Sequence, residues 1–418
     1  MHNKTDLSCR LVWNGKEAAA EKADTPQEGR LSLCEEKSIN PENTENIYIY
    51  IEGDNLAAMK LMLREYRGLI GAVYIDPPYN TGSGFVYSDP RLPHCDWLNM
   101  IYPRLMLAKQ LLAEDGVMFI SIDDYEIDNL KLACSDIFGS ENVEVMVWHK
   151  VGYGDAGAGK MKISRRFRCE HEYIVVCYKN AGKVSFCRVN ELPNFKNSYG
   201  NPDNDPRGPY KTGNISKTEG KSNENGKNFY AVTSPDGEKT YRRQWHFDRR
   251  QFELLQGDNR IYWGKSGHAV PGIKIFLNEP RKVVPASIIK NAGSAASANK
   301  KLERLMGGRY FENPKPVELI EYLLSLIDSK ELAVLDFFSG SATTAHAVMN
   351  QNAKDGGSRR FIMIQEPESC GENSEAYKNG FQNICEIGRR RIILAGEEPA
   401  IKKSAADTGF KTFCVELP

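Results

Sequence analysis

Residues 72–80 read Ala-Val-Tyr-Ile-Asp-Pro-Pro-Tyr-Asn, an apolar run that ends in a carboxylate, two prolines and an aromatic residue. The apolar half predicts a buried strand. Consecutive prolines remove two backbone donors and keep the preceding residues extended, so carbonyl groups can point outward as a rigid ledge. Asp76 and the Pro77 carbonyl could accept both hydrogens of a planar amine, and Tyr79 offers a ring face to a heteroaromatic base. Asp76, Pro77, Pro78 and Tyr79 are therefore the predicted catalytic residues; a plain Pro-Pro turn is the alternative.

A second stretch, residues 334–345, reads Val-Leu-Asp-Phe-Phe-Ser-Gly-Ser-Ala-Thr-Thr-Ala and predicts a strand, a turn of small residues and a helix. Gly340 would let a ligand approach the backbone closely, and the start of the helix offers free N–H groups to a carboxylate or phosphate. A further strand is predicted at residues 361–364. It is followed by Glu366, where an acid could bind ribose hydroxyls. A solvated strand end is the alternative for Glu366.

Strands alternate with helices on both sides of these stretches. β-branched and aromatic runs predict the strands, and apolar residues at helical spacing predict the helices. The expected strands cover residues 47–51, 71–75, 117–122, 143–148, 173–178 and 332–338, and the expected helices cover residues 56–63, 97–112, 124–139 and 316–327. This alternation predicts an α/β fold with a mainly parallel, doubly wound sheet. Residues 197–228 are dense in Gly, Asn, Pro and Lys and predict a long loop or the edge of a separate domain.

Charge is distributed unevenly along the 418 residues, although 55 basic residues balance 55 acidic ones. Residues 151–310 carry 29 Lys and Arg against 15 Asp and Glu, a net charge of +14, whereas residues 1–150 carry −10 and residues 311–418 carry −4. Such a basic segment suits a polyanion, and the acidic remainder suits a neutral or cationic cofactor; a solvated basic face is the alternative. Interleaved basic and aromatic residues favour contact with phosphates and bases. The candidate nucleic-acid-binding residues are Arg242, Arg243, Arg249 and Arg250, with Tyr241, Trp245 and Phe247 among them.

Several functional classes lack their sequence signals. No stretch approaches the ~20 apolar residues of a membrane span, and the first residues lack the apolar run of a signal peptide, so we expect a cytoplasmic protein without a membrane partner. The ten cysteines form no C-x-x-C pair and the seven histidines no H-E-x-x-H, so neither a metal site nor a disulfide framework is expected. Residues 154–161 nearly match a phosphate-binding loop, but Met161 lacks the hydroxyl that binds magnesium. A mobile basic loop is the preferred interpretation.

Together the motifs resemble those of the β-class amino-methyltransferases of DNA, in particular the adenine-N6-specific modification (Mod) subunits of type III restriction-modification systems. The resemblance rests on Asp76–Tyr79 preceding Asp336–Ser341 along the chain. Further stretches that carry it are Ile51–Leu56, Phe119–Asp124, His171–Tyr173, Asp203–Gly208 and Asn313–Pro316. It spans nearly the whole chain, and the set is specific although each stretch alone is not.

The resemblance implies a Rossmann-like, S-adenosylmethionine-dependent methyltransferase fold with circularly permuted motif order. The implied segments are an N-terminal arm (1–46), a catalytic half (47–190), an inserted target-recognition region (191–312) and a cofactor-binding half (313–418). The catalytic residues would hold a flipped adenine of double-stranded DNA. The residues implied to bind S-adenosylmethionine are Asp54, Asp336, Phe337, Gly340, Ser341, Thr343 and Glu366. Ala342 stands where the family usually has a second glycine.

Two alternatives to adenine methylation stay open from the sequence. Cytosine-N4 methylation would use the same kind of pocket to bind a different exocyclic amine, although Asp rather than Ser at position 76 favours adenine by resemblance. From a different class, the chain could be a non-catalytic DNA-binding regulator that retains the fold. The sequence also leaves open whether the chain is solitary, forms a homodimer or pairs with a restriction subunit.

Overall fold

The computed structural model describes residues 11–39, 48–82, 89–151, 167, 169–191, 199–404 and 408–418. The chain divides into two compact units: unit 1 consists of Met1–Cys187 and Pro285–Pro418, and unit 2 of Arg188–Val284. Unit 2 thus ends earlier than the segment 191–312 expected for target recognition. The residues after Val284 belong to unit 1 because β14 (Ile288–Ile289) pairs with β5 (Val143–His149), and because α6 (Ala295–Met306) packs against α10 (Ile384–Gly396).

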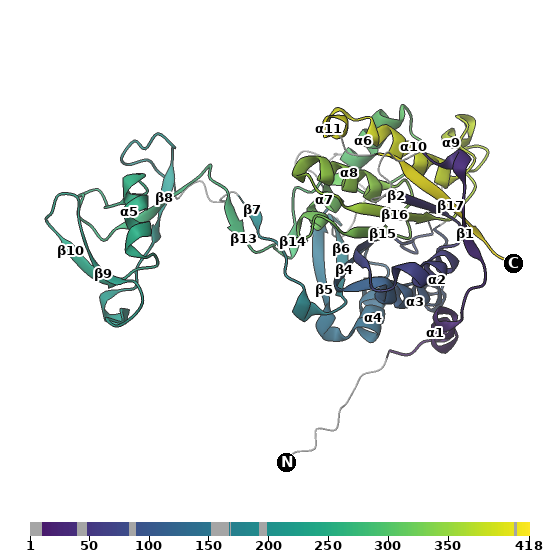
Figure 1. Cartoon of the computed structure of the whole chain (residues 1–418), viewed down its shortest axis with the longest axis horizontal. Coiled ribbons are helices and arrows are strands. Elements are labelled where there is room, and N and C mark those ends of the chain that lie inside the picture. Colours follow the sequence, from purple (N-terminus) through teal and green to yellow (C-terminus); the bar gives the residue numbers. More distant parts are fainter. Residues whose placement is uncertain are drawn as a thin grey trace, which may run out of the picture. The chain divides into compact units, whose positions relative to one another are not determined.

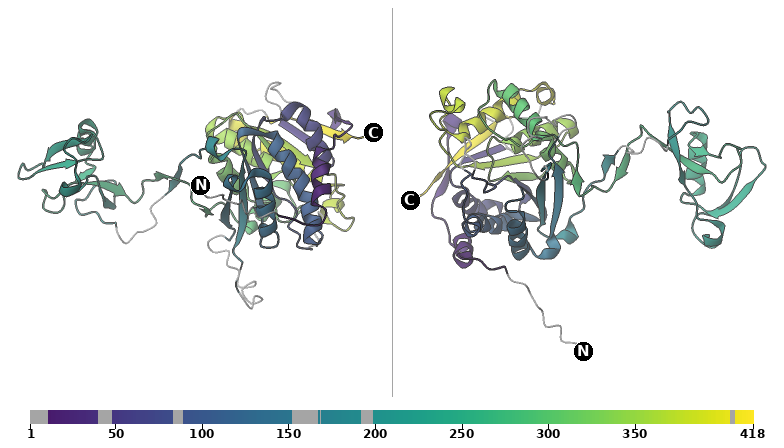
Figure 2. Two further views of the ribbon diagram at one scale, coloured as in Figure 1. Left: turned by 90° about the horizontal axis from the view of Figure 1, so that it is seen from below. Right: turned by 180° about the vertical axis from the view of Figure 1, so that it is seen from behind.

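Unit 1 is built on one ten-stranded sheet (Figures 1 and 2). Its strand order is β1-β17-β2-β16-β15-β3-β4-β6-β5-β14. The strands from β17 to β4 in this order are parallel, whereas β1 pairs antiparallel with β17, and β6 pairs antiparallel with β4 and β5. The expected mainly parallel α/β sheet is thereby confirmed. Besides β5 and β14, the strands are β1 (Arg30–Leu33), β2 (Tyr48–Glu52), β3 (Ile70–Ile75), β4 (Leu112–Ile122), β6 (His171–Tyr178), β15 (Ala333–Asp336), β16 (Arg360–Gln365) and β17 (Phe410–Glu416).

Helices cover both faces of this sheet (Figure 1). One layer contains α1 (Lys16–Asp24), α2 (Asn55–Tyr66), α3 (His94–Leu111) and α4 (Ile127–Phe138). The other contains α6, α7 (Val317–Ser325), α8 (Thr343–Asp355), α10 and α11 (Pro399–Lys403), and the short α9 (Glu375–Lys378) follows β16. Strands covered on both faces need apolar side chains throughout, which is why β3 reads Ile-Gly-Ala-Val-Tyr-Ile and is almost entirely buried.

The segment expected as an N-terminal arm takes part in this architecture. Within residues 1–46, α1 packs on α3, and β1 extends the sheet by pairing with β17. Trp13 anchors the segment because its indole nitrogen donates to Asn99 Oδ1 at 2.7 Å. Cys34 and Cys414 form a disulfide with Cα atoms 6.5 Å apart, which the cysteine spacing did not predict. The pairing of β1 with β17 brings these two residues together across the sequence.

Unit 2 is a small α/β unit with its own core. The residues 197–228, expected as a long loop or the edge of a separate domain, contain β8 (Tyr210–Asn214), which pairs with β12 (Gly272–Phe276). The remaining elements are β7 (Val189–Glu191), β9 (Phe229–Thr233), β10 (Thr240–Gln244), α5 (Arg249–Gly257), β11 (Ile261–Tyr262) and β13 (Arg281–Val283). Its core contains Ile215, Val232, Trp245, Phe252, Ile261 and Trp263. Among the described residues of the chain, no helix is long and apolar enough to cross a membrane.

Candidate active site

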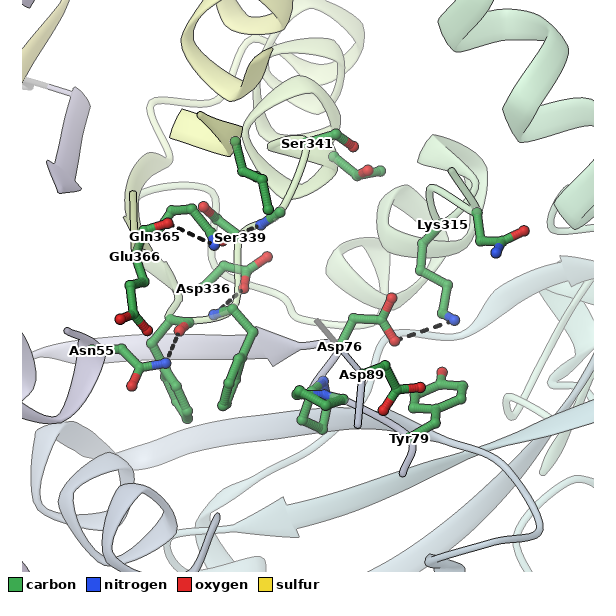
Figure 3. Close-up of a pocket in the computed structure, with 18 of the residues that line it drawn as sticks. Asn55, Asp76, Tyr79, Asp89, Lys315, Asp336, Ser339, Ser341, Gln365 and Glu366 are labelled. Atoms are coloured by element: carbon green, nitrogen blue, oxygen red, sulfur yellow. Dashed lines mark hydrogen bonds and ion pairs between the residues drawn. The ribbon is translucent and has the colours of Figure 1, made fainter. Parts of the chain in front are cut away.

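The two stretches singled out in the sequence meet at one edge of the sheet. β15 and β3 are parallel neighbours with Leu335 opposite Val73, so the segments that follow both strands leave the same edge. A cavity of about 540 Å³ lies there, lined by Asp76–Tyr79 on one side and Asp336–Ser341 on the other (Figure 3). The structure therefore brings the predicted catalytic residues and most of the predicted cofactor-binding residues into one pocket.

Trp97 on α3 holds the catalytic segment in place. Its buried indole nitrogen donates to the Pro78 carbonyl at 2.8 Å. That hydrogen bond fixes the orientation of the Pro78 carbonyl, next to Asp76 and the Pro77 carbonyl, which are the acceptors predicted for an amine. Tyr79 is half-buried, and its hydroxyl donates to Glu172 Oε2 at 3.2 Å.

Asn80 sets the direction of the chain just after the pocket. Its φ of 63° lies in the left-handed region, which asparagine tolerates better than most residues. Its side-chain amide donates to Glu126 Oε1 at 2.7 Å and to the Leu92 carbonyl at 2.9 Å, while its Oδ1 accepts from the Leu92 amide at 2.5 Å. Glu126 is fully buried. The backbone amide of Asn80 donates to Asp89 Oδ1 at 2.8 Å. Internal hydrogen bonds thus fix the direction of the chain at Asn80, a role that the sequence did not reveal.

A chain of alternating charges runs through the wall of the pocket. Lys315 Nζ lies 3.2 Å from Asp76 Oδ1 and 2.9 Å from Glu172 Oε2, and Lys150 Nζ lies 3.3 Å from Glu172 Oε1. The same Lys315 ammonium lies 4.6 Å from the centre of the Tyr79 ring. Figure 3 shows Lys315 pointing toward Asp76 from the segment before α7. The stretches that contain Lys315 and Glu172 carried the family resemblance, but sequence reasoning gave neither residue a role.

The titration of these groups follows from burial and pairing. Burial raises the pKa of Asp76, Lys315 opposes this effect, and Glu172 adds to it. Burial would also raise the pKa of Glu172, but Lys315 and Lys150 outweigh it and the pKa is lowered. For Lys315, burial lowers the pKa, but Asp76 and Glu172 outweigh it and the pKa is raised. Lys315 is therefore a cation at neutral pH, shared by two carboxylates.

The opposite wall of the pocket is formed by the turn between β15 and α8. The Asp336 carboxylate accepts from the Phe338 amide at 3.0 Å and from the Thr344 hydroxyl at 2.5 Å. Burial raises the pKa of Asp336 to about 7, although these two hydrogen bonds oppose it. Gly340 has a φ of 51°, a left-handed conformation that glycine adopts without strain, and a Cβ atom there would lie 3.2 Å from the Phe311 ring, so a larger residue would have to displace that ring. The Gly340 amide donates to Gln365 Oε1 at 2.7 Å.

Arg391 supports this turn from behind. The fully buried guanidinium donates to Ser341 Oγ at 2.9 Å and to Thr343 Oγ1 at 2.6 Å, so these two predicted cofactor-binding residues are positioned by Arg391. Burial lowers the pKa of Arg391 to about 9. Ala342 between them has a φ of 60°, the left-handed conformation in which the family's usual glycine is unstrained. An arginine some fifty residues downstream gave no local signal of this role.

The other predicted cofactor-binding residues lie beside the turn. Phe337 is buried, and its carbonyl accepts from Asn55 Nδ2 at 2.7 Å. Glu366 is exposed and lines the cavity. Asp54 does not line the cavity, although its neighbour Asn55 does. Asp54 caps α2 by accepting a hydrogen bond from the Ala57 amide at 2.8 Å. Asp54 also pairs with Arg104, which lines the cavity.

Acidic side chains dominate the lining of the cavity. It contains Asp76, Asp89, Glu172, Asp336, Glu366 and Glu368 against Lys315 and Arg104. Such a surface favours a cationic or neutral ligand over a phosphate. The charge therefore fits S-adenosylmethionine, whose sulfur is positive, and Gly340 lines the same cavity.

The four predicted DNA-binding arginines lie in unit 2 but differ in exposure. Arg242, Arg249 and Arg250 are exposed, whereas Arg243 is mostly covered and lies 3.4 Å from Glu219. Alternate residues of an extended chain face the same side, and Arg243 of β10 lies two residues before Trp245, which is 2% exposed. Trp245 belongs to the core of unit 2, and the expectation that it would contact bases is wrong.

Unit 2 also contains a cluster that composition did not suggest. Asp236, Glu238 and His268 place one ligand atom each within 4.8 Å of one another. His268 Nδ1 lies 3.1 Å from Asp236 and 3.2 Å from Glu238, so one imidazole nitrogen lies within hydrogen-bond distance of both carboxylates. The loop at residues 154–161 that resembles a phosphate-binding loop lies outside the described residues.

Comparisons with known proteins agree with this arrangement. The family model N6_N4_Mtase, described as DNA methylase, matches residues 70–376. The StyLTI Mod subunit, a type III restriction-modification enzyme of Salmonella typhimurium (strain LT2), is 32% identical over 90% of this chain and 61% of its own length. The EcoPI Mod subunit of Escherichia phage P1 is 32% identical over 97% of this chain and 71% of its own. A crystal structure of M1.HpyAVI with SAM matches 82% of this chain and 98% of its own at 14% identity, with a TM-score of 0.38, too low to support a comparison of sites.

Proposed function

The chain belongs to the DNA methylase family whose model matches residues 70–376, and on that premise we propose that it transfers a methyl group from S-adenosylmethionine to the exocyclic amine of adenine in double-stranded DNA. The observation that carries the proposal is the single cavity with Asp76–Tyr79 on one wall and Asp336–Ser341 on the other. One wall offers acceptors for an amine, and the other offers acidic and small residues for a cationic cofactor. Both reactants would therefore meet in about 540 Å³.

Asp76 and the Pro77 carbonyl would activate the amine. The lone pair of this amine is delocalised into the ring, which makes the nitrogen a poor nucleophile. Two acceptors that bind both N–H groups favour a tetrahedral nitrogen as the new bond forms, so they stabilise the transition state more than the ground state. When bound, S-adenosylmethionine supplies an electrophilic methyl group on a positively charged sulfur. The Asp76 carboxylate, whose pKa burial raises, is placed to take the proton that the amine loses.

Tyr79 would stack on the target base. An adenine inside a duplex cannot reach the cavity, so it must leave the base stack at a cost of a few kcal/mol. Contact with the Tyr79 ring offsets part of that cost. The hydroxyl bond to Glu172 and the nearby Lys315 ammonium hold this ring in one orientation.

Unit 2 would bind the DNA backbone. Residues 188–284 carry 17 Lys and Arg against 11 Asp and Glu, so this unit is basic while the catalytic cavity is acidic. The exposed Arg242, Arg249 and Arg250 are the proposed phosphate contacts. Base specificity requires side chains that reach groove edges, which charge alone does not identify.

The relatives named above are Mod subunits of type III restriction-modification enzymes, so we place the proposed activity in such a system with a restriction subunit as partner. Measurement of the mass in solution, alone and with the partner, distinguishes a single copy, a homodimer and the mixed complex. A DNA substrate makes the cytoplasm the proposed place of action.

Methyl transfer to duplex DNA tests the proposal directly. Unmethylated DNA is incubated with S-adenosylmethionine and the protein, and its nucleosides are identified by mass spectrometry. We expect N6-methyladenine from the wild type and at least ~100-fold less from Asp76→Ala, because an acceptor used in the transition state is lost. Asp115→Ala, which removes an exposed aspartate on β4, is the matched control and should remain active. N4-methylcytosine would assign the other amine, and bound cofactor without any methylation would indicate a non-catalytic regulator.

A further inference from the structure

We propose that Lys315 is a positioning residue for methyl transfer: it holds the Asp76 carboxylate and the Tyr79 ring in their working arrangement, with Glu172 as its second anchor. This inference rests on the proposed function and adds a residue to it. The proposal gives Lys315 no contact with the amine or with the methyl group. It acts through the two residues that would touch the base.

Three contacts from one ammonium carry the inference. Lys315 Nζ lies 3.2 Å from Asp76 Oδ1, 2.9 Å from Glu172 Oε2 and 4.6 Å from the centre of the Tyr79 ring. Its side chain is 11% exposed, so these contacts are shielded from solvent. An ammonium on one side of Tyr79 covers part of that ring and leaves the remaining ring surface for a base.

The surrounding backbone holds Lys315 rigidly. Pro314 and Pro316 flank it and restrict φ on both sides, and α7 begins at Val317. Asn313 has a φ of 51°, which turns the chain into this segment. Glu172 lies on β6, where Ile122 of β4 pairs with the following Tyr173, so the second anchor belongs to the central sheet.

The charges around Asp76 predict what the ammonium does. Asp76 faces Lys315, Glu172 and the Tyr79 hydroxyl, and Tyr74 and Asp336 lie close enough to interact with its charge. Lys150 and Asp123 act on Glu172 from further along the same wall. Removal of the Lys315 charge would leave the Asp76 and Glu172 carboxylates facing one another in a shielded pocket. The Asp76 carboxyl would then hold its proton to higher pH and lose the capacity to accept from the amine.

The rate of methyl transfer in a single turnover, measured against pH, tests the inference. In Lys315→Met we expect the acidic limb of the profile to move about 1 to 3 pH units upward, the range typical for one opposite charge in contact with a carboxylate. Lys315→Arg should restore most of the wild-type profile. Lys354→Met removes a lysine paired with Glu321 on α7 and should leave the limb unmoved.

A second variant should shift the acidic limb in the opposite direction. Glu172 raises the pKa of Asp76, so Glu172→Gln should move the acidic limb downward, and adding it to Lys315→Met should return the limb toward the wild type. These opposite movements cannot arise from a general loss of structure, and S-adenosylmethionine binding within about two-fold of wild type verifies folding. If the acidic limb moves in neither Lys315→Met nor Glu172→Gln, the inference is overturned, even if the rate of methyl transfer falls. If the wild type methylates no DNA while it binds the cofactor, the proposed function fails instead.

Discussion

We expect Asp336→Asn to stabilise unit 1 at alkaline pH while it weakens the binding of S-adenosylmethionine. The Asp336 side chain is buried at 3% exposure and accepts from the Phe338 amide and the Thr344 hydroxyl. Asparagine can keep the first bond with its carbonyl oxygen and can donate to the threonine hydroxyl in place of the second. The substitution therefore removes the charge and little else.

The size of the effect follows from the pKa of Asp336, which burial raises from 3.8 to about 7. A carboxyl group whose pKa is raised by folding stabilises the folded state when protonated. Its contribution is fully present below about pH 4 and is lost as the pH rises to about 7. A shift of about 3 units corresponds to roughly 4 kcal/mol. Roughly 2 kcal/mol of this loss falls between pH 5.5 and pH 8.

Urea unfolding at pH 5.5 and pH 8 measures this difference. The transition of unit 1 is the one that S-adenosylmethionine shifts in the wild type. We expect the stability of Asp336→Asn relative to wild type to increase by about 2 kcal/mol between the two pH values. Asp355→Asn, which changes the last residue of α8, is the control. Burial of Asp355 is outweighed by its pair with Arg359, its pKa is lowered, and its contribution changes only below about pH 4. If the free energy of unfolding of both variants changes between pH 5.5 and pH 8 as much as that of the wild type, the charge argument for Asp336 is refuted.

Three further sets of substitutions test other parts of the molecule. Asn80→Ala and Asn80→Gly both lose the buried hydrogen bonds to Glu126 and Leu92. The free energy of unfolding of the alanine variant should be lower than that of the glycine variant by about 0.5–1 kcal/mol, because the left-handed backbone strains alanine. Equal free energies of unfolding would contradict this strain. Lys274→Met removes the buried ammonium from Asp203 and Asp205, but Arg207 still pairs with Asp205. We expect it to destabilise unit 2 by about 1.5–3 kcal/mol in calorimetry, while cofactor binding stays unchanged. In DNA titrations over a range of salt, alanine at Arg242, Arg249 or Arg250 should each reduce the logarithmic slope by about 0.9, whereas Arg243→Ala, which loses its pair with Glu219, should not. A uniform slope across the four variants would remove the distinction between exposed and covered arginines.

The architecture of unit 1 could be predicted because its signals are local. Buried strands such as β3 are almost continuously apolar, and amphipathic helices separate them, so the parallel sheet follows from the pattern. The meeting of Asp76 and Asp336 also follows, since the carboxyl ends of parallel strands share one edge. The pairing of β1 with β17 joins the two ends of the described chain, and no local pattern indicates such a partner.

The parts of the site that the sequence missed depend on distant partners. Lys315 and Glu172 belong to segments that meet only in the folded sheet, and Arg391 reaches the turn before α8 from a later helix. One available signal was overlooked. Tyr241 and Trp245 lie four residues apart with polar residues between them, a spacing that places both on the same side of an extended chain. Their residue types alone suggested a surface for nucleic acid.

The two strands that join unit 2 to the rest of the chain bear on how members of this family diversify. The chain enters this unit through β7 (Val189–Glu191) and returns through β13 (Arg281–Val283), and these strands pair antiparallel with Arg281 opposite Glu191. The two junctions are therefore neighbours, although about ninety residues separate them along the chain. Recombination between genes at these two points would exchange everything beyond the ribbon as a cassette and leave all ten strands of the large sheet intact. Inheritance of the chemistry and turnover of the inserted unit can then proceed at different rates.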